Sequence, residues 1–461
     1  MAHPERSNLL FVFSDQHRWC DLGCYGNREV HSPHLDEFAA TGLRFTTCIS
    51  NSPLCVPIRG TLLTGRYALR HGAITNDLPM RHDVPTIAHV LRAGGYHTGY
   101  IGKWHLAGVP RDQPIPAAAG RFGFEEWKVC NCNHHYMAAY YYDEENRRIP
   151  IEGYEPIAQT DLAIDFIRRN RARRPWALVL SWGSPHDPYR LVPEPYLRRY
   201  DGRELPLRPN VTEVVAATPT RRLTRADLLR YYQGYYAQIT ALDDQFGRLL
   251  AALRATDQLA RTVVIYTSDH GDMLGSHGYL DKQLPHEESI RVPLIAGGDE
   301  RLARGVCDEM IGLVDLPVSL MALLGLHFPE EVDGADLHRL FLAPEAKGLD
   351  ECYLYDLVPC HQAAARNGRE WRGIRTRHYT YARTASDEGF VLFDNGADPY
   401  QLRNRIADPD HQALKVELMR RLDRHIARND ALLPWEELLR RYGLKEAWNR
   451  SQAYFGLPLL D

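Results

Sequence analysis

Four short runs of apolar residues recur along the chain, and each is followed directly by polar side chains. The runs cover residues 9–13, 97–102, 176–182 and 262–267. The polar residues that follow them include Asp15, Lys103, His186 and Asp269. Continuous apolar runs of this length are typical of strands buried on both faces of a mostly parallel sheet. Because ligands bind beyond the carboxyl ends of such strands, we expect these polar residues to converge at one edge of the sheet.

Helical patterns fill the intervals between the strands. They cover residues 33–41, 86–93, 160–171 and 227–254. The alternation of strand and helix predicts an α/β fold with a mostly parallel central sheet flanked by helices. From about residue 345 the pattern changes to short alternating segments, which are typical of antiparallel strands. We therefore predict a larger domain over residues 1–345 and a smaller α+β domain with a short antiparallel sheet over residues 346–461.

The composition narrows the class of protein and its partners. Lys and Arg total 55 against 59 Asp and Glu, so the net charge is −4 and nothing favours nucleic acid as a partner. Nine cysteines, an odd number scattered over 461 residues, are unlike a disulfide framework and favour a reducing compartment. No apolar run has the length of a signal core or a membrane span. We expect a cytoplasmic protein that does not enter a membrane.

Four polar side chains at two strand ends offer a divalent-cation site. They are the carboxylates of Asp15 and Asp269, the amide of Gln16 and the imidazole of His270. Hard cations prefer oxygen ligands, although a histidine ligand suits Mn²⁺ and Zn²⁺ better than Ca²⁺. The alternative is that each strand-end aspartate caps the helix that follows it.

Cys55 stands in a run of distinctive spacing, Cys-x-Pro-x-Arg followed by Leu-Thr-Gly-Arg. Pro57 suits the first turn of a helix, so Cys55 is expected at the helix N-terminus, where unpaired N–H groups favour an anion. Arg59, one turn on, faces the same side. The alternative is a buried cysteine before an ordinary helix that begins at a proline.

Taken together, these segments resemble the formylglycine-dependent sulfatases of the alkaline-phosphatase-like superfamily, which include arylsulfatases and relatives such as phosphonate monoester hydrolases. The resemblance covers most of the chain and implies that residues 1–345 are the catalytic domain. It rests on residues 8–16, 32–39, 55–66, 102–105, 268–275, 287–294, 393–394 and 398–400, together with Lys282.

The resemblance also implies how the nucleophile and the cofactors are arranged. Cys55 is oxidised to formylglycine (3-oxoalanine) by a formylglycine-generating enzyme, and the hydrate of this aldehyde attacks the sulfate ester. Arg59 holds this group. A divalent metal is implied as well, with Ca²⁺ favoured and Mn²⁺ as the alternative. Its expected ligands are Asp15, Gln16, Cys55, Asp269 and His270.

Four further residues receive roles by the same resemblance. Lys103 and Lys282 neutralise the sulfate oxygens as the S–O bond breaks. His105 takes the proton from the covalent sulfate hemiester, which releases sulfate. His186 lies near the leaving oxygen and acts as general acid. The expected activity is hydrolysis of a sulfate monoester of a small alcohol, phenol or sugar.

Two departures from the family pattern leave an alternative open. Position 16 is Gln where many members have a second Asp, and position 270 is His where many have Asn. Related phosphonate monoester and phosphodiester hydrolases have such a site and favour Mn²⁺, so they form the alternative activity. A binding protein that keeps Cys55 as a thiol is a third hypothesis, which the intact set of motifs disfavours.

The segment from Cys130 to His135 and the C-terminal tail carry weaker predictions. The Cys-x-Cys pair and its histidines lack the second ligand pair of a zinc finger, so we expect a loop over the crevice instead. In that loop Asn133, His134 and Tyr136 are expected near the leaving group. The helical tail after His411 could pack on its own subunit or on a neighbouring copy, which leaves a homo-oligomer open.

Overall fold

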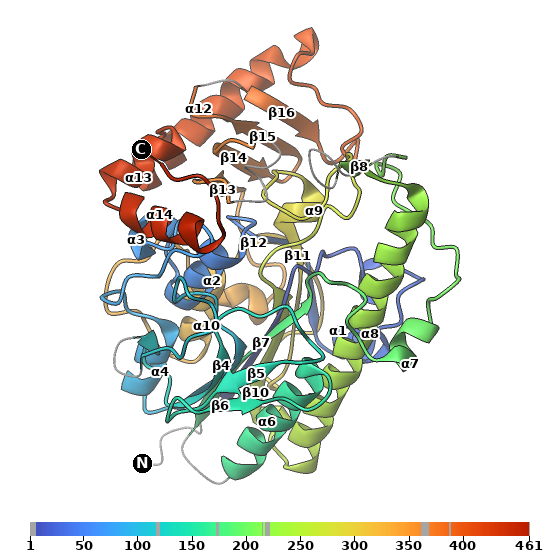
Figure 1. The fold of residues 1–461 in the computed structure, drawn as a ribbon, viewed down its shortest axis with the longest axis vertical. Coiled ribbons are helices and arrows are strands. Elements are labelled where there is room, and N and C mark those ends of the chain that lie inside the picture. The colour runs from blue at the N-terminus through green and yellow to red at the C-terminus, as the bar shows by residue number, and fades with distance from the viewer. Residues whose placement is uncertain are drawn as a thin grey trace.

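The computed structural model describes residues 6–116, 120–171, 175–213, 215–216, 222–360, 368–386 and 389–460. Most of these residues surround one ten-stranded sheet (Figure 1). Its strands, in spatial order, are β12 (Gly305–Gly312), β2 (Leu43–Ile49), β11 (Arg291–Gly298), β10 (Thr262–Ser268), β1 (Asn8–Asp15), β7 (Trp176–Pro185), β3 (His97–Lys103), β4 (Glu126–Cys130), β5 (Tyr140–Tyr142) and β6 (Arg148–Pro150).

The centre of this sheet is parallel, as the sequence predicts. β1 pairs in parallel with β10 and β7, and β3 pairs in parallel with β7 and β4. β11 runs antiparallel to both of its neighbours, so the sheet is mixed. The four predicted apolar runs form β1, β3, β7 and β10, and these four strands lie next to one another. Their carboxyl ends therefore meet at one edge.

Helices cover both faces of the sheet, which explains why its strands do not alternate in polarity. Leu9, Phe11 and Phe13 of β1 share one apolar cluster with residues of helices α2 (Cys55–Thr64), α4 (Ile87–Ala93) and α10 (Asp315–Leu323). Leu10 and Val12 share the opposite cluster with residues of α1 (Pro33–Thr41), α6 (Glu155–Arg169) and α8 (Arg225–Ala255). The predicted helices match α1, α4, α6 and α8, with ends that differ by up to five residues at the start of α6.

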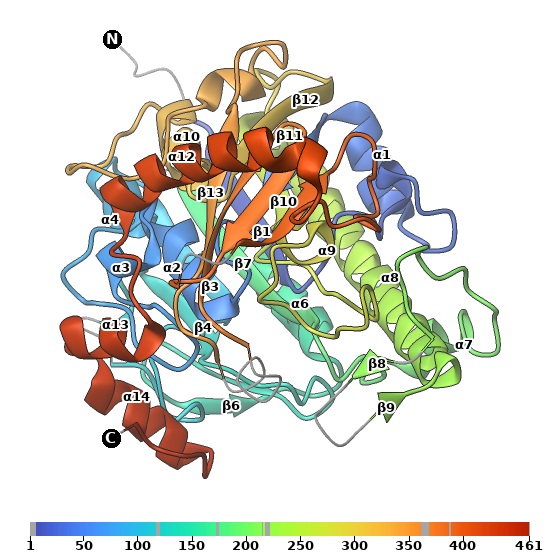
Figure 2. The same ribbon diagram turned by 90° about the horizontal axis from the view of Figure 1, so that it is seen from above.

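A second, four-stranded antiparallel sheet follows in the C-terminal part, as predicted. Its strands are β13 (Glu351–Asp356), β14 (Trp371–Thr376), β15 (Tyr379–Arg383) and β16 (Gly389–Asp394). One face packs on α12 (Gln412–Asn429), and the other packs on Ile49 and Ile290 of the larger sheet region. Figures 1 and 2 show this sheet with α12, α13 (Trp435–Arg441) and α14 (Lys445–Tyr454) gathered at one end of the molecule. The division at residue 345 stays a prediction.

Short elements connect these layers. They are the helices α3 (Ala68–His71), α7 (Glu194–Arg198) and α9 (Glu287–Ile290), and the strand pair β8 (Val215–Ala216) and β9 (Arg222–Leu223). Of the helices within the described ranges, none combines the length and the apolar composition that a bilayer span requires.

Candidate active site

Cys55 is the first residue of helix α2 and is buried, as the motif predicts. Leu54, before it, has extended backbone angles, and its carbonyl accepts the N–H of Ile58 at 3.2 Å. The backbone N–H of Val56 donates to the side-chain oxygen of Asn76 at 3.1 Å. The thiol thus lies at the positive end of a helix that begins inside the protein.

Three side chains from the ends of β1 and β10 surround the Cys55 thiol. Its Sγ lies 3.2 Å from His270 Nε2 and 3.8 Å from Asp15 Oδ1. Ligand atoms of Asp15, Cys55, Asp269 and His270 all lie within 4.8 Å of one another, and the four residues are buried. His270 Nδ1 lies 2.9 Å from the carbonyl oxygen of Gly271, which can only accept, so Nδ1 carries the proton. Nε2 therefore faces the cluster, and it offers a lone pair to a cation when the ring is neutral.

Arg59 fixes both carboxylates from behind. Its Nη2 donates to Asp15 Oδ2 and its Nε donates to Asp269 Oδ2, each at 3.0 Å. Nη1 donates to Ser181 Oγ at 2.7 Å and to the carbonyl of Lys103 at 3.0 Å. Because the guanidinium binds the Oδ2 atoms, the Oδ1 atoms remain directed at the cluster.

The donor set fits a divalent cation. Two carboxylate oxygens and an imidazole nitrogen converge with residue 55 in a buried space, as cation sites of mixed oxygen and nitrogen ligands require. The side chain of Gln16 is engaged differently, since its Oε1 accepts from Lys282 Nζ at 2.5 Å and its Nε2 donates to Asp272 at 2.8 Å. Ligation by Gln16 therefore stays a prediction.

Two lysines and a histidine complete a positively charged rim. Lys103 Nζ binds Asp15 Oδ2 at 2.6 Å, and Lys282 Nζ lies 2.8 Å from His186 Nε2. Burial and Asp15 act to raise the pKa of Cys55, but the charges of Lys282, Lys103 and His270 outweigh them and hold it well below its usual value. The site therefore stabilises a negative charge at position 55.

His105 reaches the site from the end of β3 and lies beside an acid that the sequence did not indicate. Its Nε2 lies 3.5 Å from Asp77 Oδ1, and Arg111 binds the same carboxylate through two nitrogens at 2.7 and 2.8 Å. Burial opposes protonation, but Cys132 and Asp77 together raise the pKa of His105 to about 10. Three residues that support the site lie in loops, where no sequence motif or periodic spacing indicates a functional role. They are Asn76, Asp77 and Arg111.

The loop after β4 does reach this site. His134 stacks on His186 with ring centroids 4.3 Å apart, and Tyr136 donates from its hydroxyl to the backbone carbonyls of Gly183 and His186 at 2.9 Å. Asn133 instead accepts the N–H of His135 within its own loop. Contacts with a leaving group stay a prediction for all three residues.

Comparisons with known proteins identify the family models and relatives that this chain matches. The family model described as "Sulfatase" matches residues 7–326, and the model described as "N-sulphoglucosamine sulphohydrolase, C-terminal" matches residues 275–428. The ulvan-active sulfatase of Formosa agariphila is 34% identical over 430 residues, which cover 92% of this chain and 82% of that protein.

Two solved structures share the fold. The crystal structure of YidJ from Bacteroides fragilis superposes with a TM-score of 0.84 at 27% identity and covers 94% of this chain and 98% of its own. A phosphonate monoester hydrolase of Silicibacter pomeroyi superposes with a TM-score of 0.75 at 24% identity, over 92% of this chain and 96% of its own. The second likeness is one of fold alone.

Proposed function

The chain belongs to the sulfatase family, a family of hydrolases that act on sulfate esters, and we propose that its substrate is a sulfate ester of a saccharide. The observation that carries this proposal is the position of Cys55 at the N-terminus of α2, against Asp15, Asp269 and His270 and beneath the ammonium groups of Lys103 and Lys282. The saccharide is supported by the family model for a sugar sulphohydrolase, which spans residues 275–428.

Formylglycine at position 55 and a bound divalent cation would supply the nucleophile and polarise the ester. The residues that would hold the cation are Asp15, Asp269 and His270, with Gln16 as a further candidate. Arg59 orients the two carboxylates through its bonds to both Oδ2 atoms. This bridge keeps the site ordered before substrate binds.

The cationic rim binds the sulfate group and handles protons. Lys103 and Lys282 neutralise the charge that grows on the sulfate oxygens, in a buried space where fixed cations act strongly. His186 is held through Nδ1 at 2.8 Å from the carbonyl oxygen of Asp187, and its Nε2 lies 2.8 Å from Lys282 Nζ. His186 acts as general acid together with Lys282, whose ammonium supplies the proton that passes to the leaving oxygen. His105, whose Nε2 lies 3.5 Å from Asp77 Oδ1, is assigned the proton transfer at the nucleophile.

The metal, the maturation partner and the location are further parts of the proposal. We favour Ca²⁺, with Mn²⁺ as the alternative because His270 supplies a nitrogen. The sequence contains the cysteine, proline and arginine that a formylglycine-generating enzyme needs in its substrate. They are Cys55, Pro57 and Arg59. All nine cysteines are free in the structure, which supports a reducing, cytoplasmic location.

One experiment tests the sulfatase assignment against the phosphonate alternative. Protein co-expressed with a formylglycine-generating enzyme is analysed by mass spectrometry of the Cys55 peptide. It is then assayed with aryl and saccharide sulfates and with an aryl phosphonate, each under Ca²⁺ and Mn²⁺. We expect formylglycine at position 55, preference for sulfates, loss of turnover in Cys55→Ala and normal turnover in the control Cys24→Ala. A preference for the phosphonate, or unaltered turnover by Cys55→Ala, would overturn the proposal.

A further inference from the structure

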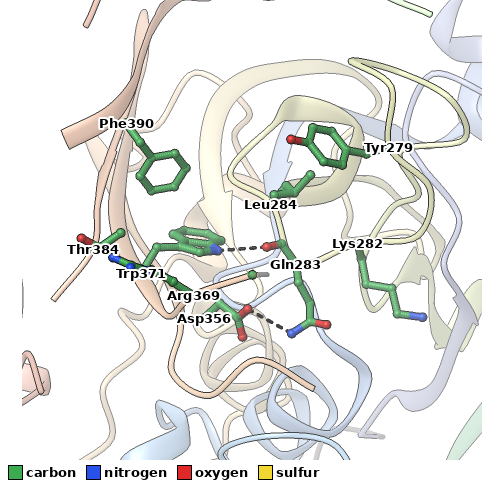
Figure 3. A pocket seen from close by; sticks show the side chains of 10 residues that line it. Tyr279, Lys282, Gln283, Leu284, Asp356, Arg369, Trp371, Thr384 and Phe390 are labelled. Atoms are coloured by element: carbon green, nitrogen blue, oxygen red, sulfur yellow. Dashed lines mark hydrogen bonds between the residues drawn. The ribbon is translucent and has the colours of Figure 1, made fainter. Parts of the chain in front are cut away.

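A pocket of about 250 Å³ lies where the second sheet meets the segment that contains Lys282 (Figure 3). A backbone hydrogen bond connects the wall of this pocket to the segment that carries the nucleophile. The N–H of Gln283 donates to the carbonyl of Pro53, two residues before Cys55, at 3.1 Å. Lys282 and Gln283 are consecutive, and Lys282 reaches the cationic rim while Gln283 lines the pocket. The pocket is therefore next to a lysine of the cationic rim.

Asp356, at the end of β13, is the acid of this pocket and is only 2% exposed. Its Oδ2 accepts from Gln283 Nε2 at 3.0 Å, a bond that Figure 3 shows. Its Oδ1 is buried and has no hydrogen-bond partner among the described residues. Because buried polar atoms are nearly always paired, an unpartnered oxygen in the wall of a pocket points to a ligand.

The surroundings of Asp356 favour its protonated form. Burial is the largest influence and raises the pKa of this carboxyl well above its usual range, against the opposing effects of Gln283 and Arg372. Since Oδ2 already accepts from Gln283, the proton belongs on the unpartnered Oδ1. The pocket therefore offers a hydrogen-bond donor at Oδ1 to a bound molecule.

Three aromatic side chains line the pocket, together with Leu284, Arg369 and Thr384. Trp371 and Phe390 come from the second sheet, and Tyr279 lies across from them. The indole N–H of Trp371 donates to the backbone carbonyl of Gln283 at 2.9 Å, which fixes the ring. Aromatic faces beside one placed polar group suit a sugar ring, with its apolar C–H faces and its oxygen atoms.

We propose that Asp356 determines specificity for the saccharide by donating a hydrogen bond from Oδ1 to a hydroxyl or amide oxygen of a sugar unit bound in this pocket. This inference rests on the proposed sulfatase function and adds the group of the substrate that is recognised. Phenyl sulfate has no hydroxyl or amide oxygen to offer there, so it leaves the carboxyl unpaired.

The test compares substrates within each variant. Wild type, Asp356→Ala and Asp356→Asn are assayed with a panel of sulfated hexoses, hexosamines and disaccharides, and with phenyl sulfate as the aryl reference. The readout is the ratio of kcat/KM for the best saccharide to that for the aryl sulfate. We expect Asp356→Ala to lower this ratio about 10- to 100-fold, as the loss of a buried hydrogen bond to substrate does. Asp356→Asn should keep most of it, because its amide can accept from Gln283 and donate to the sugar.

A control on the same strand separates recognition from damage to β13. Glu351, at the other end, pairs with Arg421 and His425, and Glu351→Gln should leave the ratio unchanged. An unchanged ratio in Asp356→Ala, or an equal loss in Asp356→Asn, would overturn the proposal. If Asp356→Ala does not fold, deoxy analogues of the best saccharide are tested on wild type, where one of them must show the same loss. Failure of wild type to hydrolyse any sulfate would instead refute the proposed function.

Discussion

Replacing Arg59 by lysine keeps one positive charge in the site but removes the planar fork of the guanidinium. The fork joins Asp15 Oδ2 to Asp269 Oδ2 and also donates to Ser181 and to the Lys103 carbonyl. A lysine ammonium is a single nitrogen with three donors, so it cannot serve these four acceptors in the same geometry. At least one carboxylate must therefore lose a charge-assisted hydrogen bond, while Lys103 still binds Asp15 and two backbone N–H groups still bind Asp269 Oδ1.

The expected magnitude follows from the bonds that are lost. A hydrogen bond to a charged group contributes about 1.5–3 kcal/mol, and about 1.4 kcal/mol corresponds to a tenfold change in an equilibrium constant. The loss of one such bond therefore predicts cation binding that is weaker by a factor of about 10 to 150. Substitutions of residues that support metal ligands cost about 10- to 100-fold in affinity, which agrees.

The assay is calorimetric titration of chelator-treated protein with Ca²⁺ and with Mn²⁺. Arg301→Lys is the matched control, because Arg301 also binds one carboxylate, that of Asp299, through two nitrogens, but its side chain is half exposed. We expect Arg301→Lys to bind the cation as wild type does. If Arg59→Lys also binds it with wild-type affinity, the fork does not orient the carboxylates and the reasoning is refuted.

Two further predictions concern buried acids outside the metal cluster. Burial raises the pKa of Glu155 to about 8, so between about pH 5 and pH 8 the folded protein keeps a proton that the unfolded chain loses. The free energy of unfolding should therefore fall by up to about 1.4 kcal/mol per pH unit as pH rises, and Glu155→Gln should remove this slope. Urea unfolding at three pH values measures this slope, with Glu152→Gln, at an exposed position, as control. The prediction is contradicted if the free energy of unfolding depends on pH equally in wild type and Glu155→Gln. Asp430→Asn should lower the free energy of unfolding by about 3–5 kcal/mol, because Arg372 loses its buried carboxylate partner; a loss below about 1 kcal/mol would show that this ion pair contributes little.

The sequence predicts the central sheet well, because a strand that is covered on both faces must be apolar along its whole length. Such a continuous apolar run is easy to recognise in the sequence. The sequence also predicts that Asp15, Lys103 and Asp269 meet, since parallel strands end at a common edge. Asp77 could not be predicted in the same way. It lies in a loop, and its place beside His105 depends on how that loop folds back, for which no periodicity gives a signal.

Asp356 could not be predicted from the sequence for a different reason. It ends an edge strand of the second sheet, so its position relative to the nucleophile depends on how two separately patterned regions pack together. That packing is set by dispersed apolar residues such as Ile49 and Ile290, whose partners are far away in the sequence. Residues that recognise a substrate across such a contact carry no local pattern, whereas residues that perform chemistry at strand ends do.

The pair Lys282–Gln283 links recognition to chemistry. Gln283 has a φ of 70°, which non-glycine residues rarely adopt, and it is held by Pro53, Trp371 and Asp356. Its neighbour Lys282 contacts Gln16 and His186. Because consecutive residues share one backbone, the geometry that places Gln283 against Asp356 also fixes the position of the Lys282 ammonium. A change that loosens the pocket therefore displaces a catalytic cation as well, so specificity and rate cannot be adjusted independently at this position.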